Sequence, residues 1–196
     1  MATDFRQLEE FRDKIQALAD EKCSRFCDEC TKELTGRLLA KVIKRTPVGT
    51  KPTRAKKGES EGSYEDDEGN IKYRVSKDRY NEYWAGYVGG TLRRGWTGGQ
   101  KVNVNDVSSY AKGLPVNVMS NEHRIDIINQ VEYASYVEYG HRQTPGRYVP
   151  ALGKRLKQSW VKGQFMMTDS VHELDAQAGA IVQRKLDKFL KDEGLG

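Results

Sequence analysis

Apolar side chains recur at helical spacing through the first 45 residues, and this repeat constrains the fold more than any other feature of the chain. Because residues three or four apart share one face of a helix, the pattern predicts one long helix or two consecutive ones from about Asp4 to Arg45. Thr46-Pro47 ends it, since the residue before a proline avoids the helical conformation. Gly36 is its weak point, where a bend would be tolerated. The apolar face consists of Phe5, Leu8, Phe11, Ile15, Leu18, Cys23, Cys27, Leu34, Leu38, Val42 and Ile43.

The second half of the chain predicts a small sheet and another long helix. Three segments show the period of two that is typical of strands. A tight turn at Ser120-Asn121-Glu122 would join the last two segments into an antiparallel meander. The final helix is predicted from about Met166 to Lys191. The three segments are Val102 to Val107, Leu114 to Val118, and Ile125 to Ile128.

Residues 49–89 look like an insertion between these elements. Lys51–Lys57 carries four basic residues and no acid, and Glu59–Glu68 carries six acids and no base. Few apolar residues precede Ile71, so the stretch cannot fill a core. Ile71 to Val75 and Tyr83 to Val88 are candidates for a short hairpin or edge strands.

A short tyrosine-rich helix is predicted between Val131 and Arg142. Tyr133, Tyr136 and Val137 lie at i, i+3 and i+4 on one face, and a helix this short must dock against something larger. Tyrosines are also common interface anchors. Two interpretations stay open: the helix packs between the sheet and the terminal helices and partly reaches a neighbouring subunit, or its tyrosines are core residues only. The candidates for a subunit contact are Tyr133, Tyr136, Tyr139, His141 and Trp96.

The order of long helix, small antiparallel sheet, short helix and long helix predicts an α+β fold. A length of 196 residues suits a single domain, with the inserted loop at about 49–89. No apolar run approaches the length that spans a bilayer, and the N-terminus lacks a basic-then-apolar signal, so we expect synthesis in the cytoplasm and no membrane contact.

The charge of the chain favours acidic partners without marking a dedicated DNA-binding domain. The formal net charge is +5 and the sequence pI is about 9.0. His141 to Gly163 contains no acidic residue, and its prolines and glycines predict an irregular loop. We expect this loop to lie near DNA or to meet an acidic partner surface, unless it is a solvated loop that pairs within the chain. Its basic residues are Arg142, Arg147, Lys154, Arg155, Lys157 and Lys162.

Trp160 among these cations is the one sign of an alternative function, a sequence-independent nucleic-acid-binding protein. Such a protein needs its basic residues on one continuous face with aromatic platforms.

The remaining residue patterns do not point to chemistry. Cys23, Cys27 and Cys30 could grip zinc only with a fourth ligand, and no histidine lies near them in sequence. Buried free cysteines on a helical stripe are the simpler interpretation. His141 has no serine or cysteine nucleophile in a suitable context, and the glycine pairs do not follow the phosphate-loop pattern. We therefore expect no enzyme activity, no metal and no cofactor.

Four segments occur in a distinctive order. They are Leu-Leu-Ala-Lys-Val-Ile-Lys-Arg-Thr-Pro-Val (Leu38 to Val48), Gly-Thr-Leu-Arg-Arg-Gly-Trp (Gly90 to Trp96), Ile-Ile-Asn-Gln-Val-Glu-Tyr-Ala-Ser-Tyr-Val-Glu-Tyr-Gly-His-Arg (Ile127 to Arg142) and Val-Lys-Gly-Gln-Phe-Met-Met (Val161 to Met167). In this order they resemble the tail-component family found in the neck of lambda-like and HK-type long-tailed bacteriophages. The resemblance covers most of the chain from about Leu34 onward. The first two motifs usually sit almost adjacent in that family, whereas residues 49–89 intervene here.

The resemblance implies a non-enzymatic virion protein that forms a ring in the neck, where it completes the tail or joins the tail to the DNA-filled head. Closed rings follow from head-to-tail contacts between identical subunits. The implied partners are further copies of the chain, head-closure or connector proteins, tail-terminator or tail-tube proteins, and phage DNA in the lumen. The implied location is the virion, after assembly in the host cytoplasm. We also expect the basic and acidic halves of the insertion to pair between adjacent subunits.

Overall fold

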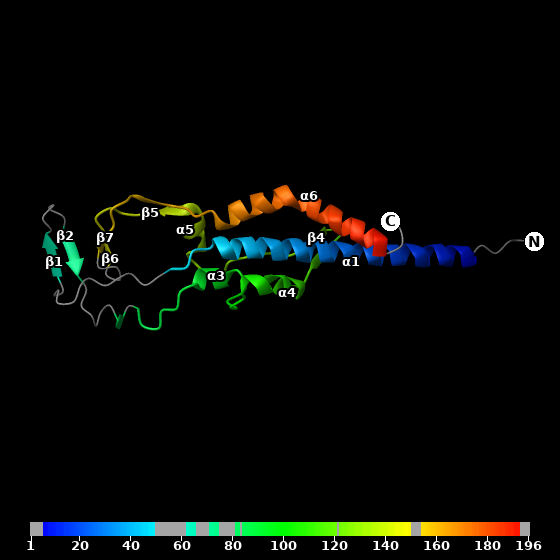
Figure 1. The fold of residues 1–196 in the computed structure, drawn as a ribbon, viewed down its shortest axis with the longest axis horizontal. Helices are drawn as coiled ribbons and strands as arrows, with labels where there is room; N and C mark the ends of the chain where they lie inside the picture. Colours follow the sequence, from blue (N-terminus) through cyan, green and yellow to red (C-terminus); the bar gives the residue numbers. More distant parts are fainter. Residues whose placement is uncertain are drawn as a thin grey trace, which may run out of the picture. The chain divides into compact units, whose positions relative to one another are not determined.

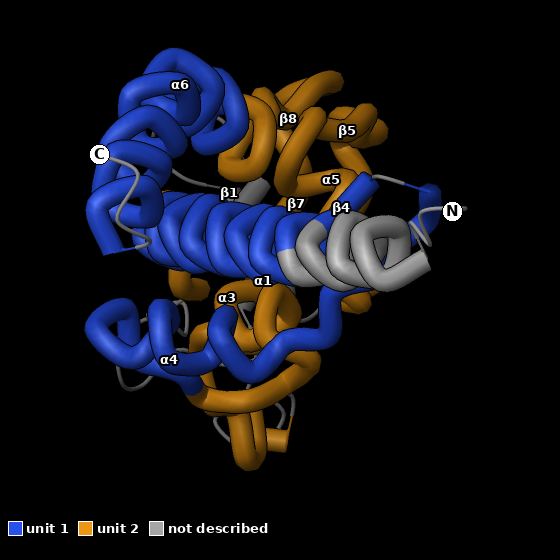
Figure 2. The backbone as a smooth tube through the Cα atoms, turned by 90° about the vertical axis from the view of Figure 1, so that its right-hand side faces the viewer, with its two compact units in different colours: residues 1–44, 102–128, 169–196 blue, residues 45–101, 129–168 orange. Residues whose placement is uncertain are grey.

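The computed structural model describes residues 6–49, 62–65, 71–74, 81–82, 84–120, 122–149 and 154–192 (Figure 1). The predicted α+β fold is confirmed: a long N-terminal helix is followed by small antiparallel strand pairs, short helices and a long C-terminal helix. The described residues fall into two compact units (Figure 2). Unit 1 lies within residues 1–44, 102–128 and 169–196, and unit 2 within residues 45–101 and 129–168. The single domain with an inserted loop stays a prediction.

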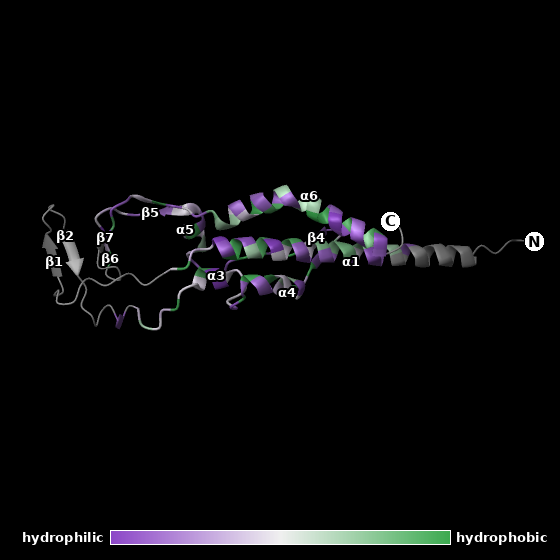
Figure 3. Cartoon of the chain, in the orientation of Figure 1, coloured by the Kyte–Doolittle hydropathy of each residue, from purple (hydrophilic) through white to green (hydrophobic). Residues whose placement is uncertain are grey.

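Two long helices, α1 (Arg6–Arg45) and α6 (Met166–Asp192), run antiparallel in unit 1. The rings of Phe26 and Phe189 have centroids 5.1 Å apart, and Lys41 Nζ lies 2.7 Å from Glu173 Oε2. Contacts that advance along α1 therefore move back along α6. Figure 3 shows hydrophobic and hydrophilic residues alternating along α6 and the coloured part of α1, as expected for helices with one buried face. Both predicted helices are confirmed, although Phe5 and the side chains of Leu8, Phe11, Ile15 and Leu18 lie outside the described residues.

A short helix packs closely on α1 where the chain was predicted to form a strand. The 3-10 helix η1 (Val104–Asp106) leads into α4 (Val107–Lys112). Val107 and Ala111, one helical turn apart, are both fully buried, so the apolar residues follow a helical period and the predicted strand from Val102 to Val107 is wrong. A Cβ added to Gly36 would lie 3.3 Å from Ala111 Cβ, and α1 continues through this glycine. Gly36 therefore allows close packing, with α4 on one side of α1 and α6 on the other (Figure 2).

A tight hairpin follows α4. Strands β3 (Asn117–Met119) and β4 (Glu122–Arg124) pair antiparallel, so the predicted turn at Ser120-Asn121 is confirmed, with Asn121 itself outside the described residues. The third segment of the predicted meander, residues 125–128, forms no strand, and that part of the prediction is wrong.

His123 fastens this hairpin to α1. Its Nδ1 lies 2.6 Å from Asp28 Oδ1, and its backbone carbonyl accepts a hydrogen bond of 3.4 Å from Thr31 Oγ1. These contacts complete the packing of unit 1 around α1. The buried apolar residues of this unit are Cys30, Leu39, Val42, Ile43, Val107, Ala111 and Ile181.

The three cysteines of α1 differ in exposure. Cys30 is buried and burial raises the pKa of its thiol, Cys27 is half-buried, and Cys23 is exposed. The expected buried stripe is therefore confirmed for Cys30 and wrong for Cys23. Within the described ranges, no three His, Cys, Asp or Glu side chains are grouped so that they could hold a metal ion. None of the helices described has an apolar stretch long enough to cross a membrane.

Within the predicted insertion, β1 (Gly62–Glu65) pairs antiparallel with β2 (Ile71–Arg74). The strand predicted from Ile71 is thus confirmed, but its suggested partner from Tyr83 to Val88 is wrong, because residues 84–86 form a turn. The basic stretch Lys51–Lys57 and most of the acidic stretch Glu59–Glu68 lie outside the described residues.

In the segment from His141 to Gly163, predicted as an irregular loop, the described residues on either side of 150–153 instead pair as two antiparallel strands. Strand β5 pairs with β8 and β6 with β7, and backbone hydrogen bonds between Gln143 and Ser159 and between Arg147 and Leu156 continue the ladder between them. We call residues 140–149 and 154–162 the hairpin arm; Figure 1 shows it extending away from α5. The elements of unit 2 after the insertion are α3 (Thr91–Gly95), α5 (Ala134–Tyr139), β5 (Gly140–Arg142), β6 (Tyr148–Val149), β7 (Lys154–Arg155) and β8 (Trp160–Lys162).

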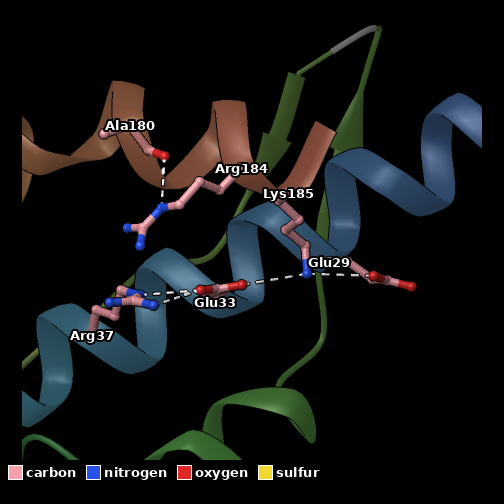
Figure 4. A network of polar contacts seen from close by, with 6 residues as sticks. All are labelled: Glu29, Glu33, Arg37, Ala180, Arg184 and Lys185. Carbon is pink, nitrogen blue, oxygen red and sulfur yellow. Dashed lines mark hydrogen bonds and ion pairs between the residues drawn. The ribbon is translucent and has the colours of Figure 1, made fainter. Parts of the chain in front are cut away.

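An ionic network links the two long helices of unit 1 (Figure 4). Lys185 Nζ lies 3.4 Å from a carboxylate oxygen of Glu29 and 3.4 Å from one of Glu33. Glu33 also accepts two hydrogen bonds from Arg37, at 3.1 and 2.8 Å. The Arg37 guanidinium, aided by Lys185, holds the pKa of the Glu33 carboxyl below its ordinary value. Arg184 donates to the Ala180 carbonyl of its own helix and stands outside this network.

We expect Glu33→Gln to destabilise the protein by about 0.5–1 kcal/mol at neutral pH, as for other partly exposed ion pairs. Because the pKa of Glu33 is lower in the folded protein, its ionised form contributes stability above the unfolded pKa and loses that contribution as the pH falls through the folded value. The difference in stability between Glu33→Gln and wild type should therefore shrink as the pH falls below about 4.5. Thermal unfolding followed by circular dichroism measures it. The control is Glu122→Gln on exposed β4, and a difference that does not change with pH would contradict the assignment.

Candidate functional site

The residue that follows α1 is held by two side chains of the Gly90–Trp96 motif. Thr46 is fully buried, and its carbonyl accepts hydrogen bonds from Arg93 Nε at 3.2 Å and Nη2 at 2.7 Å. Its hydroxyl accepts one from Trp96 Nε1 at 2.8 Å. Arginine suits this position because the last carbonyls of a helix lack intrahelical partners. Trp96, a predicted subunit contact, is only 8% exposed, so that prediction is wrong and Trp96 packs inside unit 2.

The two ends of the predicted insertion meet. A Cβ added to Gly89 would lie 2.7 Å from the Gly49 carbonyl oxygen, and a Cβ on Gly49 would lie 2.5 Å from the Tyr87 hydroxyl. Neither position has room for a larger residue unless its surroundings move. The insertion thus leaves and rejoins the rest of unit 2 at one point, next to the Thr46 contacts.

Asn129 joins α3 to the start of the tyrosine segment. Its Nδ2 donates to the Leu92 carbonyl at 2.9 Å, and its Oδ1 accepts from the Val131 amide at 3.1 Å. A Cβ on Gly95 would lie only 2.1 Å from that Oδ1, so this contact requires a glycine in α3. The motif segments at 90–96 and 127–142 are therefore joined through Asn129, which contacts Leu92 and Gly95.

The carboxylate of Glu138 caps the first turn of α6. Its Oε2 accepts the Met167 amide at 3.0 Å, and its Oε1 accepts the Thr168 amide at 2.9 Å and the Thr168 hydroxyl at 2.8 Å. The first amides of a helix lack intrahelical acceptors, and the helix dipole favours a negative charge there. Glu138 is only 6% exposed, so these bonds replace its water.

Two glycines let the backbones beside this cap come together. A Cβ on Gly163 would lie 2.3 Å from the Glu138 carbonyl oxygen, and one on Gly140 would lie 2.3 Å from the Val161 carbonyl oxygen. Gly140 also has a positive φ of 82°, which favours glycine. The end of α5 and the two strands of the hairpin arm are thus held at close backbone contact.

Tyr136 and Tyr139 of α5, and Tyr133 directly before it, face outward. Tyr133, Tyr136 and Tyr139 are 45%, 58% and 63% exposed, so the interpretation that they are only core residues is wrong. The inward face is formed by the less exposed residues Ala134, Val137 and Glu138. The Glu138 cap explains which face of α5 points inward, because Glu138 can reach the first turn of α6 only from that face.

His141 is half-buried beside this face. Its ring meets the Tyr136 ring edge-on with centroids 5.7 Å apart, and its Nε2 lies 3.4 Å from Gln143 Nε2. The His141 ring therefore packs against the Tyr136 ring and helps to hold it in place. The subunit contact predicted for His141 remains a prediction.

The predicted basic residues lie along the hairpin arm. Arg142, Arg147, Arg155, Lys157 and Lys162 are exposed, while the side chain of Lys154 lies outside the described residues. Arg155 also donates a hydrogen bond to the Gly146 carbonyl.

Sequence reasoning missed the residues that hold this site together: Thr46, Arg93, Asn129 and Glu138. Each is bonded to a residue far away in the chain: Thr46 accepts from the side chains of Arg93 and Trp96, and Glu138 accepts from the amides 29 and 30 residues later. The only local signal was the spacing of Ala134, Val137 and Glu138, which also defines a helical face. As arranged, these polar atoms fix the backbone and leave tyrosines and cations on the surface.

We expect Glu138→Gln to lower the free energy of unfolding by about 1–3 kcal/mol, because the amide group would place a donor against backbone donors. Urea unfolding followed by tryptophan fluorescence is suited to this test, since Trp84, Trp96 and Trp160 all lie in unit 2. Glu132→Gln, an exposed change of the same kind, should stay within about 0.5 kcal/mol of wild type. Equal effects of the two substitutions would contradict the capping role.

Comparison with known proteins shows the family of this chain. The family model described as "Bacteriophage HK97-gp10, putative tail-component" matches residues 9–140, about two thirds of the chain. The match begins well before Leu34 and includes the first two motif segments and the third as far as Gly140; the fourth, Val161 to Met167, lies beyond it. No curated protein and no solved structure matches the chain. The resemblance is confirmed, and the chain belongs to the HK97-gp10-like family of bacteriophage tail components.

Proposed function

We propose that this tail component is a structural subunit that closes into a ring in the phage neck, where the ring completes the tail or joins it to the DNA-filled head. Membership of a tail-component family supports a structural role in the virion. The ring, its place in the neck and assembly in the host cytoplasm are the parts that we propose.

The exposed tyrosines of α5 carry this proposal. Tyr133, Tyr136 and Tyr139 present wide aromatic area to solvent, each at 45% exposure or more. Tyrosine is enriched among residues that dominate binding energy at interfaces. A contact of this kind is strongest when the side chains are held in place beforehand, and the Glu138 cap with Gly140 and Gly163 holds α5 in that way.

A ring needs the tyrosine face to meet a different surface of the next subunit. Such head-to-tail contacts close when the rotation between neighbours divides a full turn. The two open sides of the ring would then be free for the head-closure or connector proteins and for the tail-terminator or tail-tube proteins. Pairing between the basic and acidic halves of the insertion would add to the same subunit contact.

We expect the triple substitution of Tyr133, Tyr136 and Tyr139 to alanine to shift purified protein from rings to monomers. Truncating one tyrosine at the centre of an interface costs about 1–2 kcal/mol, or roughly 5- to 30-fold in affinity. Sedimentation velocity and negative-stain microscopy measure the outcome.

Two controls make the result specific. The same three positions changed to phenylalanine keep the aromatic area and should keep most assembly. Met119→Ala removes a side chain that is 77% exposed on unit 1 and should change nothing. Rings that persist in the triple alanine variant would refute the tyrosine contact, and a wild-type protein that stays monomeric at all concentrations would contradict autonomous ring closure.

A further inference from the structure

The hairpin arm is a two-stranded ribbon with an irregular centre. Gly140 pairs with Lys162 and Arg142 with Trp160 near its base, and Tyr148 pairs with Arg155 farther along. Between these paired regions, residues 143–147 lie opposite residues 156–159, so one strand has an additional residue, as in a β-bulge. A ribbon of this width fits the major groove of duplex DNA and can also follow a phosphate backbone.

The charge of the arm is of one sign. Six arginines and lysines, and no aspartate or glutamate, lie between Gly140 and Gly163. Among the side chains that the structure describes, no carboxylate pairs with Arg142, Arg147, Lys157 or Lys162. In unit 1, by contrast, Arg37, Lys41 and Lys185 each meet a glutamate within 4 Å. Like charges that are exposed and unpaired attract polyanions.

One face of the ribbon adds an aromatic platform to this charge. Because directly paired residues share a face, Arg142, Trp160 and Lys162 lie on the same side, and all three are exposed. Trp160 is 50% exposed between two cations. His141 and Val161, on the other side, are less exposed, and His141 contacts Tyr136 of α5. The face with the cations is therefore directed away from α5.

From these observations we infer that the hairpin arm binds the phosphate backbone of nucleic acid without sequence specificity. Arg142 and Lys162 contact phosphates, and Trp160 offers a surface on which an unpaired base stacks. This binding does not depend on ring closure, although a ring of such arms would bring many of them to one strand.

Fluorescence anisotropy of the full chain with a labelled duplex, between about 50 and 200 mM salt, tests the inference. We expect the affinity of wild type to fall steeply with salt. The double variant Arg142→Ala/Lys162→Ala should reduce the slope of log affinity against log salt by about two and weaken binding at least tenfold at low salt.

The matched control is Arg184→Ala/Lys188→Ala. It removes the same two charges from exposed positions of α6 in unit 1 and should leave the affinity within about twofold of wild type. Circular dichroism of both variants confirms that they fold. An equal loss in the control would mean that net charge alone binds DNA, which overturns the role of the arm.

Trp160→Ala distinguishes the two forms of nucleic acid. Loss of stacking should weaken binding of a single strand about 5- to 150-fold and leave the duplex nearly unchanged. Absence of salt-sensitive binding to both forms would refute the inference, and binding of polyglutamate in place of DNA would assign the arm to an acidic protein. Sedimentation of the same samples reports ring formation separately, so that rings without DNA binding would contradict this inference alone.

Discussion

A buried carboxylate at the start of α6 is the constraint on which the described part of unit 2 depends. An ionised side chain loses its water on burial, so Glu138 must obtain equivalent hydrogen bonds from the protein, and it obtains them from Met167 and Thr168. Glu138 must therefore point inward, which sets the rotation of α5 and leaves its tyrosines outside. Beside this cap, the backbone at the end of α5 lies so close to the backbone at residues 161–163 that positions 140 and 163 accept only glycine without a rearrangement.

The long helices could be predicted from sequence because many residues repeat one signal over several turns. The shorter elements could not, since each owes its form to a partner far away in the chain. Val104 and Val107 fit a strand or a helix equally well until packing of Ala111 against Gly36 decides between them. The rotation of α5 depends on amides 29 and 30 residues later, which no local pattern indicates. The strands of the hairpin arm were not predicted, because the prolines and glycines of this segment are typical of an irregular loop.

The segments that carry the family resemblance contact one another through specific hydrogen bonds and close backbone approaches. Thr46 is held by Trp96, Gly95 makes room for Asn129, and Glu138 caps α6. In each case a polar group of one segment satisfies a backbone or hydroxyl group of another, so the segments are required together even though they lie far apart in sequence. A structural subunit needs this kind of specificity, since its product is a surface of fixed shape.

The close contact of Gly49 with Gly89 has a practical consequence. A loop whose two ends already touch adds little further entropy cost as it grows, because that cost rises only with the logarithm of its length. Residues 50–88 can thus be lengthened at little cost, and an epitope or a small fluorescent domain with neighbouring termini can be inserted among them while Thr46 keeps its contacts with Arg93 and Trp96. Such a tagged subunit would let the protein be located inside an intact phage particle.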